Sequence, residues 1–171
     1  MYVPKILAID PGTRYIGVAI LQGSDLLYTK VKIIRHNETP GRIFHYGKEI
    51  VRDLIKEFAP NRFAIERPFV FRSSAALVRS LTDELVAEAT QAGLSTYQYF
   101  PTTIRSYLCG RSDATKRDVA GVVAKTFPQL SLHLDPFNEA DERYYSHIFD
   151  AVAVGLMCQI DLDMYRGQEA A

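Results

Sequence analysis

Three carboxylates and one histidine stand where the surrounding sequence is apolar. Asp10 ends the run "KILAID", Glu66 ends the run "RFAIE", and His147 and Asp150 interrupt the run "HIFDAVAVGLM". Because His147 and Asp150 are three residues apart, their side chains point the same way on a helix. A buried carboxylate without a partner is costly, and several together need a compensating cation. Carboxylate oxygens suit Mg²⁺ and Mn²⁺, so these four residues are candidate metal ligands.

Each of the four residues also has an ordinary structural interpretation. A single acid at a strand end is often a turn former or a helix cap, and a neutral histidine such as His147 buries well with one hydrogen bond. The metal hypothesis depends on the four side chains acting together, since two bound metal ions can activate a water and stabilise the leaving oxygen in phosphodiester hydrolysis. Two roles stay open for His147, which could bind a metal or orient the attacking water as a general base.

The hydrophobic pattern predicts the elements that position these residues. Apolar or alternating runs predict five strands, namely "KILAID", "YIGVAIL", "LLYTKVKII", "RFAIE" and "STYQYF". Helical spacing predicts helices over 42–58, from Ser73 or Ser74 to about Ala92, over "TTIRSYL", over "TKRDVAGVVAKTF" and from about Ser146 to Ile160. The segment 129–145 is expected to be a loop or lid.

This order of elements predicts an α/β fold. Short turns join the first three strands into an antiparallel meander, and single strands then alternate with helices. We therefore expect a central mixed five-stranded sheet, with the meander followed by parallel strands and with helices on both faces. With no internal repeat or linker, residues 1–171 are expected to form a single domain.

Composition narrows the function classes only in part. The formal net charge of the 171 residues is +0, which by itself gives no support to a nucleic-acid partner. The middle of the chain is basic, however, and the last third is acidic, so a local basic face is possible. The apolar runs are too short for a membrane span. Two widely spaced cysteines and no basic-then-apolar leader indicate free thiols in the cytoplasm.

An aromatic and basic segment follows Glu66. Phe69 and Phe71 lie beside Arg67 and Arg72, with Arg79 a little further on. Interleaved basic and aromatic side chains suit single-stranded or distorted DNA, whereas core packing and a solvated helix edge are the ordinary alternatives. Pro68 breaks the strand and favours an exposed loop.

Taken in order, the blocks "ILAIDPGTRYIGVAIL", "FAIERPF" and "HIFDAVAVGL" resemble RuvC-type Holliday-junction resolvases, which have an RNase H-like fold. The resemblance runs from Lys5 to about Gln159. It implies that Asp10, Glu66 and Asp150 are metal-binding acids, and that His147 takes the position of a fourth ligand that is usually Asp.

The resemblance also implies roles in DNA binding. Lys116 matches a catalytic lysine that contacts the scissile phosphate, and Phe69 matches an aromatic residue that stacks on a base of the opened junction. The residues to which we assign DNA contacts are Phe69, Arg67, Arg72, Arg105, Arg111, Lys116 and Arg117. The implied cofactors are two Mg²⁺ or Mn²⁺ ions per active site. The implied partners are a second copy of the chain, forming a homodimer, and a branch-migration motor. The stripe of Leu77, Leu81 and Leu85 is either core or part of the dimer contact.

Three features depart from the family pattern. Arg105 stands where Lys is common, Ser112 replaces a Gly, and the segment 129–145 is longer and more acidic than the family pattern predicts. The resemblance implies a metal-dependent endonuclease that resolves four-way junctions by paired symmetric nicks. The alternatives are a nuclease for other branched DNA, or a protein that binds branched DNA without cutting it.

Overall fold

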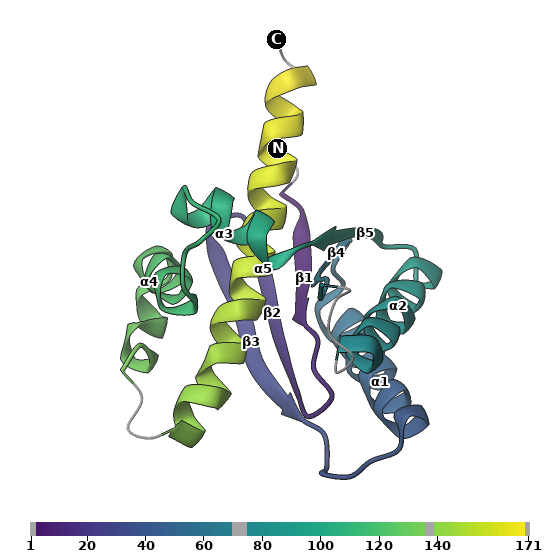
Figure 1. Cartoon of the computed structure of the whole chain (residues 1–171). Coiled ribbons are helices and arrows are strands. Elements are labelled where there is room, and N and C mark those ends of the chain that lie inside the picture. The colour runs from purple at the N-terminus through teal and green to yellow at the C-terminus, as the bar shows by residue number, and fades with distance from the viewer. Residues whose placement is uncertain (1–2, 70–74, 136–138, 170–171) are drawn as a thin grey trace.

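A computed structural model describes residues 3–69, 75–135 and 139–169. At its centre is a five-stranded sheet in the order β3-β2-β1-β4-β5 (Figure 1). The strands are β1 (Lys5–Asp10), β2 (Tyr15–Gln22), β3 (Asp25–Ile33), β4 (Arg62–Glu66) and β5 (Ser95–Tyr99). The pairs β1–β2 and β2–β3 are antiparallel, whereas β1–β4 and β4–β5 are parallel. This is the expected meander followed by parallel strands.

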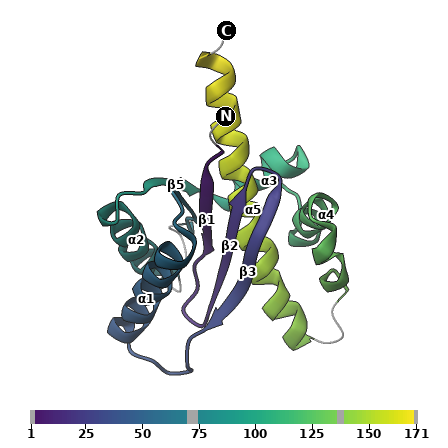
Figure 2. The same cartoon turned by 180° about the vertical axis from the view of Figure 1, so that it is seen from behind.

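Helices cover both faces of the sheet (Figures 1 and 2). One face carries α1 (Pro40–Phe58) and α2 (Ala75–Gln91), and the other carries α3 (Pro101–Cys109), α4 (Lys116–Thr126) and α5 (Glu139–Glu169). Alternation along β1 explains the two layers, because Leu7 and Ile9 face α1 and α2 while Ile6 and Ala8 face the other helices. The predicted fold class is confirmed.

The leucine stripe of α2 belongs to the core. Leu81 and Leu85 are fully buried, and Leu77 packs at the margin of the same cluster. Gly47 of α1 lets the two helices approach, since a Cβ there would lie 2.9 Å from a Leu81 methyl group. For Leu81 and Leu85, core packing is the interpretation that the structure supports.

Two predictions about the C-terminal part were wrong in extent. The closing helix is not confined to Ser146–Ile160, because α5 begins at Glu139 and ends at Glu169. The segment 129–145 is not all loop, since it includes most of a 3₁₀ helix, η1 (Pro128–His133), and the first turns of α5. The first turns of α5 lack an apolar stripe but consist largely of good helix formers, so hydrophobic spacing alone could not place the boundary. Arg72, Phe71, Ser73 and Ser74 lie outside the described residues.

No helix in the described ranges is long and apolar enough to cross a membrane.

Candidate active site

Asp10 and Glu66 are brought together by parallel strand pairing. Asp10 is the last residue of β1 and Glu66 the last residue of β4, and Ile9 pairs with Ile65 immediately before them. The carboxyl ends of neighbouring parallel strands meet at the same edge of a sheet. Asp10 is buried, with 6 % of its surface exposed.

The helix α5 places the other two candidate residues over the same edge. Close packing of α5 on β2 depends on small residues, because a Cβ at Gly17 would lie 2.1 Å from the backbone oxygen of His147. Likewise, a Cβ at Gly155 would lie 2.3 Å from a Leu21 methyl group. These two glycines let the backbone of α5 approach the sheet and set the height of His147 and Asp150 above Asp10.

His147 is hydrogen-bonded to Asp10. Its Nδ1 lies 2.6 Å from Oδ2 of Asp10, and its ring stacks on Tyr15 with the centroids 5.4 Å apart. An imidazole that donates from Nδ1 to a carboxylate is fixed in orientation and keeps the lone pair on Nε2. That nitrogen could bind a metal or take a proton from water.

The acids raise one another's pKa values. Burial, together with the charges of Asp10 and Asp150, raises the pKa of Glu66 to about 8. Burial and the charge of Asp10 also raise the pKa of Asp150, although Lys116 and His147 oppose the shift. The site therefore holds more carboxylates than its protein cations compensate, which is the electrostatic condition that a bound cation relieves.

Lys116 is the cation that contacts these acids directly. It is the first residue of α4, and its ammonium donates to Oδ2 of Asp150. Burial lowers the pKa of Lys116, but the charge of Asp150 and the hydrogen bond to it raise the pKa more, with Asp10 and Glu66 adding to the rise. Lys116 is therefore held as an ammonium.

A capping box fixes the position of Lys116. The Thr115 hydroxyl accepts from the backbone N–H of Asp118, and the Asp118 carboxylate accepts from the backbone N–H of Thr115 at 2.8 Å. The two backbone hydrogen bonds set the start of α4. Arg111 also donates to Asp118, at 2.9 Å, so this predicted DNA-binding residue stabilises the loop before α4.

A cavity of about 190 Å³ opens beside the acids. It is lined by Glu66, Arg105, Lys116 and Asp150, with apolar residues of α3, α4 and α5 around them. Arg105 thus reaches the site from α3, and its charge lowers the pKa of Glu66. The structure therefore brings together all the residues predicted to be catalytic, with Arg105 beside them.

The donor set suits Mg²⁺ or Mn²⁺, since three carboxylates and an imidazole supply hard oxygen and nitrogen ligands. Within the described ranges, no group of three acidic, His or Cys side chains converges as a ready-formed metal site. Asp10 is turned to His147, and Asp150 is turned to Lys116. The residues fit a metal in kind and place, and Asp10 and Asp150 would have to give up these partners to bind one.

The other predicted DNA contacts are spread around the site. Phe69 is 43 % exposed and stacks on Phe100, with ring centroids 5.5 Å apart. Arg67 donates to Gln98 and, at 3.4 Å, to Asp83, whereas Arg117 pairs with Asp135 in an exposed position. Their DNA contacts stay predictions.

Sequence reasoning missed Phe100, which the structure places beside Phe69. Phe100 directly follows β5, whose last residue Tyr99 pairs with Glu66. Recognising β4 and β5 as parallel neighbours would have placed Phe100 at the same sheet edge as Phe69, because Phe69 lies three residues after Glu66.

Known proteins are similar to this chain over most of its length. The sequence profile of crossover junction endodeoxyribonuclease RuvC matches residues 6–156. The protein of that name from Shewanella amazonensis is 31 % identical over 160 residues, covering 88 % of this chain and 84 % of the relative.

Among solved structures, Thermus thermophilus RuvC superposes with a TM-score of 0.75 at 23 % identity, covering 94 % of this chain and 96 % of that one. A structure of T. thermophilus RuvC with a Holliday junction substrate gives a TM-score of 0.73 at 24 % identity, with coverage of 90 % and 92 %. Both confirm the fold. By sequence profile and by a relative that it matches along most of its length, the chain belongs to the RuvC family of crossover junction endodeoxyribonucleases.

Proposed function

We propose that this chain is a metal-dependent endonuclease that cuts four-way DNA junctions. The observation that carries the proposal is the meeting of Asp10, Glu66, His147 and Asp150 at one sheet edge, in a chain of the RuvC family. Two members of that family point to the same substrate class, because one is named a crossover junction endodeoxyribonuclease and another was solved with a Holliday junction.

Asp10, Glu66, His147 and Asp150 would hold two Mg²⁺ or Mn²⁺ ions. When bound, such ions activate water and stabilise the leaving oxygen of a phosphodiester. The protein's share is to keep the four ligands at one place and largely shielded from water. The raised pKa values of Glu66 and Asp150 support this role, because a cation that replaces the proton removes the repulsion between the acids.

Lys116 and Arg105 stabilise the negative charge of the phosphate undergoing attack. Both line the cavity beside Glu66 and Asp150, and both carry positive charge at neutral pH. His147 either binds a metal through Nε2 or takes the proton of the attacking water there. Cleavage leaves a 5′-phosphate and a 3′-hydroxyl.

Phe69 and Phe100 form an exposed aromatic pair on which an unpaired base of the junction stacks. Base–aromatic stacking contributes about 1–3 kcal/mol per base and is tolerant of sequence. Arg67, Arg111 and Arg117 contact the DNA backbone around the site. A homodimer would present two such sites to the twofold-symmetric junction and make two symmetric nicks.

The test is cleavage of a synthetic four-way junction in Mg²⁺, Mn²⁺ or Ca²⁺. We expect paired nicks in two strands of like polarity with Mg²⁺ or Mn²⁺, and binding without cleavage in Ca²⁺. Linear duplex, flap and RNA–DNA hybrid substrates serve as controls. Tight junction binding with no nick in any metal would contradict the proposal and support a binding protein, and equal cutting of flaps would indicate a broader branched-DNA nuclease.

A further inference from the structure

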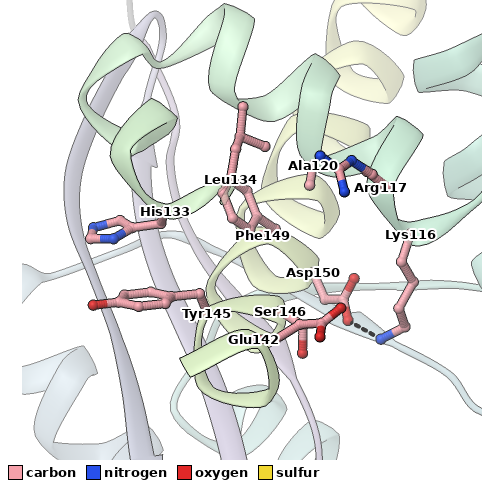
Figure 3. A pocket seen from close by; sticks show the side chains of 10 residues that line it. All are labelled: Lys116, Arg117, Ala120, His133, Leu134, Glu142, Tyr145, Ser146, Phe149 and Asp150. Atoms are coloured by element: carbon pink, nitrogen blue, oxygen red, sulfur yellow. Dashed lines mark hydrogen bonds and ion pairs between the residues drawn. The ribbon is translucent and has the colours of Figure 1, made fainter. Parts of the chain in front are cut away.

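A second cavity lies on the other side of the Lys116–Asp150 pair. It has a volume of about 120 Å³ and opens between α4, the end of η1 and the first turns of α5 (Figure 3). Lys116 and Asp150 line this cavity as well as the one that contains Glu66 and Arg105. A phosphate held at Lys116 therefore has a cavity on each side.

The walls of this cavity combine apolar surface with a polar rim. Ala120, Leu134 and Phe149 supply the apolar part, and the polar groups at the rim come from Lys116, Arg117, Glu142, Ser146 and Asp150. Tyr145 forms one side and is braced by His133, whose ring stacks on it with the centroids 4.0 Å apart and the planes 14° apart. Figure 3 shows this stacked pair at one end of the cavity and the Lys116–Asp150 pair at the other.

Part of this wall comes from the segment 129–145. His133, Leu134 and Tyr145 all belong to it. The segment therefore builds part of the cavity wall beside Lys116 and Asp150.

We propose that this cavity receives the base of a nucleotide adjacent to the cleaved phosphate. The inference rests on the proposed function, since it needs a scissile phosphate at Lys116. A nucleobase has apolar faces and a polar edge. The faces match the apolar wall and the aromatic side formed by Tyr145, and the edge matches the polar and charged groups at the rim. The nucleotide enters unstacked, and junction DNA makes this cheaper than an intact duplex does. Filling the cavity should therefore slow cleavage of a junction that carries this base.

Two neighbouring positions on α4 give a matched test. Ala120→Phe places a ring in the cavity. Gly121→Phe adds the same ring one residue later, where a Cβ has no atom within 4 Å. His133→Ala is a second variant, which removes the support of Tyr145 without filling the cavity.

The measurement is single-turnover cleavage of one junction with and without an abasic site on either side of the cut. We expect the unmodified protein and Gly121→Phe to cut the intact junction about tenfold faster than one of the abasic junctions. Ala120→Phe should cut the intact junction about as slowly as the abasic one, so that the ratio approaches one. His133→Ala should lower the ratio in part.

Binding in Ca²⁺ separates this proposal from the proposed function. If no metal supports cleavage, the proposed function fails, and the ratio of junction affinities with and without the base still tests the cavity. A ratio near one for the unmodified protein, or an unchanged ratio in folded Ala120→Phe, would overturn the base-binding cavity while leaving the nuclease intact. Circular dichroism and the thermal midpoint Tm check that each variant is folded.

Discussion

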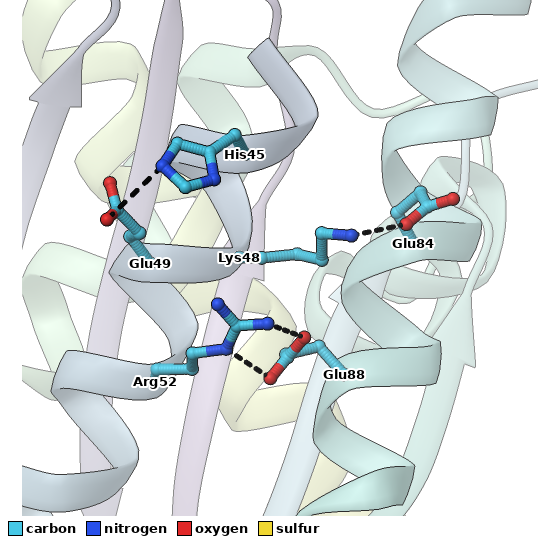
Figure 4. Close-up of polar contacts among 6 residues, drawn as sticks. All are labelled: His45, Lys48, Glu49, Arg52, Glu84 and Glu88. Carbon is cyan, nitrogen blue, oxygen red and sulfur yellow. Dashed lines mark hydrogen bonds and ion pairs between the residues drawn. The ribbon is translucent and has the colours of Figure 1, made fainter. Parts of the chain in front are cut away.

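Two lysine–carboxylate pairs in this molecule differ in how deeply the carboxylate is buried and in how many acids surround it. Lys48 of α1 donates to Glu84 of α2 at 2.9 Å on the outer face of the helix pair (Figure 4). Lys116 of α4 donates to Asp150 of α5 at the candidate active site. The carboxylate is more exposed in the first pair, with Glu84 at 45 % and Asp150 at 13 %. The lysines are in the reverse order, with Lys48 at 29 % and Lys116 at 64 %.

The two regions also differ in the balance of charge. Between α1 and α2, Figure 4 shows Glu84 facing Lys48 and Glu88 facing Arg52, which holds Glu88 with two hydrogen bonds of 2.6 and 2.8 Å. At the sheet edge, Asp10, Glu66 and Asp150 repel one another, and the pKa of Glu66 rises to about 8. Between α1 and α2, paired charges hold two helices together. At the sheet edge, the carboxylates outnumber the cations near them, so the site favours binding of an additional cation.

The largest expected effect is the loss of one acid from the active site. Asp150→Asn should lower the junction cleavage rate by about a thousandfold or more, because a neutral amide is a weaker metal ligand. Single-turnover cleavage in Mg²⁺ measures this. Glu84→Gln removes a carboxylate from the other lysine pair and should leave the rate unchanged. If Asp150→Asn and Glu84→Gln cut the junction at similar rates, the buried acid would matter no more for cleavage than the exposed one.

Changes at His147 should have the next largest effect. His147→Ala removes the partner of Asp10 and should slow cleavage about a hundredfold or more while the fold is kept. His147→Asp places a carboxylate oxygen, a potential metal ligand, at the same position. If His147 binds a metal, the Asp variant should recover most of the rate. If His147 handles the proton, the Asp variant should stay slow and the pH–rate profile should shift. Full activity of the Ala variant would remove His147 from the site.

Most residues of this candidate active site could be picked out from sequence because their signals are local. Asp10 and Glu66 end strongly apolar strands, and Asp150 interrupts an apolar helix, so each acid is conspicuous where it stands. Parallel pairing of β1 with β4 brings Asp10 and Glu66 together, and the predicted fold class includes parallel strands after the meander. The capping residues Thr115 and Asp118 likewise follow a sequence rule.

The remaining features depend on contacts that no local pattern encodes. Phe100 meets Phe69 only through the β4–β5 register, and Tyr145 meets His133 only because α5 begins earlier than its apolar stripe. The bond between His147 and Asp10 depends on how closely α5 lies on the sheet, which Gly17 permits. Gly17 is visible in the sequence, but the sequence does not say which helix crosses it.

A stability measurement tests the charge imbalance directly. The pKa of Glu66 is raised from an ordinary 4.5 to about 8, so between these values the folded protein keeps a proton that the unfolded chain has lost. Stability without metal should therefore fall as pH rises through this window. Glu66→Gln removes the penalty and should raise Tm by roughly 3–6 °C at pH 8 but little near pH 4.5.

Chelator and Mg²⁺ are the two arms of this experiment. With EDTA the Gln variant should be the more stable protein at pH 8, and with Mg²⁺ the unmodified protein should gain more stability than the variant. A Gln variant that is less stable at pH 8 without metal would show that ionised Glu66 is well compensated within the protein.

The smallest effect should come from the Lys48–Glu84 pair, whose carboxylate is the more exposed. Lys48→Met leaves Glu84 in contact with water, and exposed pairs contribute little because water and salt screen them. Tm should change by no more than about 2 °C, and junction cleavage should be unchanged. Adding 1 M NaCl should shrink the difference from the unmodified protein. A large, salt-resistant loss of stability would mean that Lys48 and Glu84 behave like a buried pair, and the contrast with Lys116 and Asp150 would then rest on charge balance rather than on exposure.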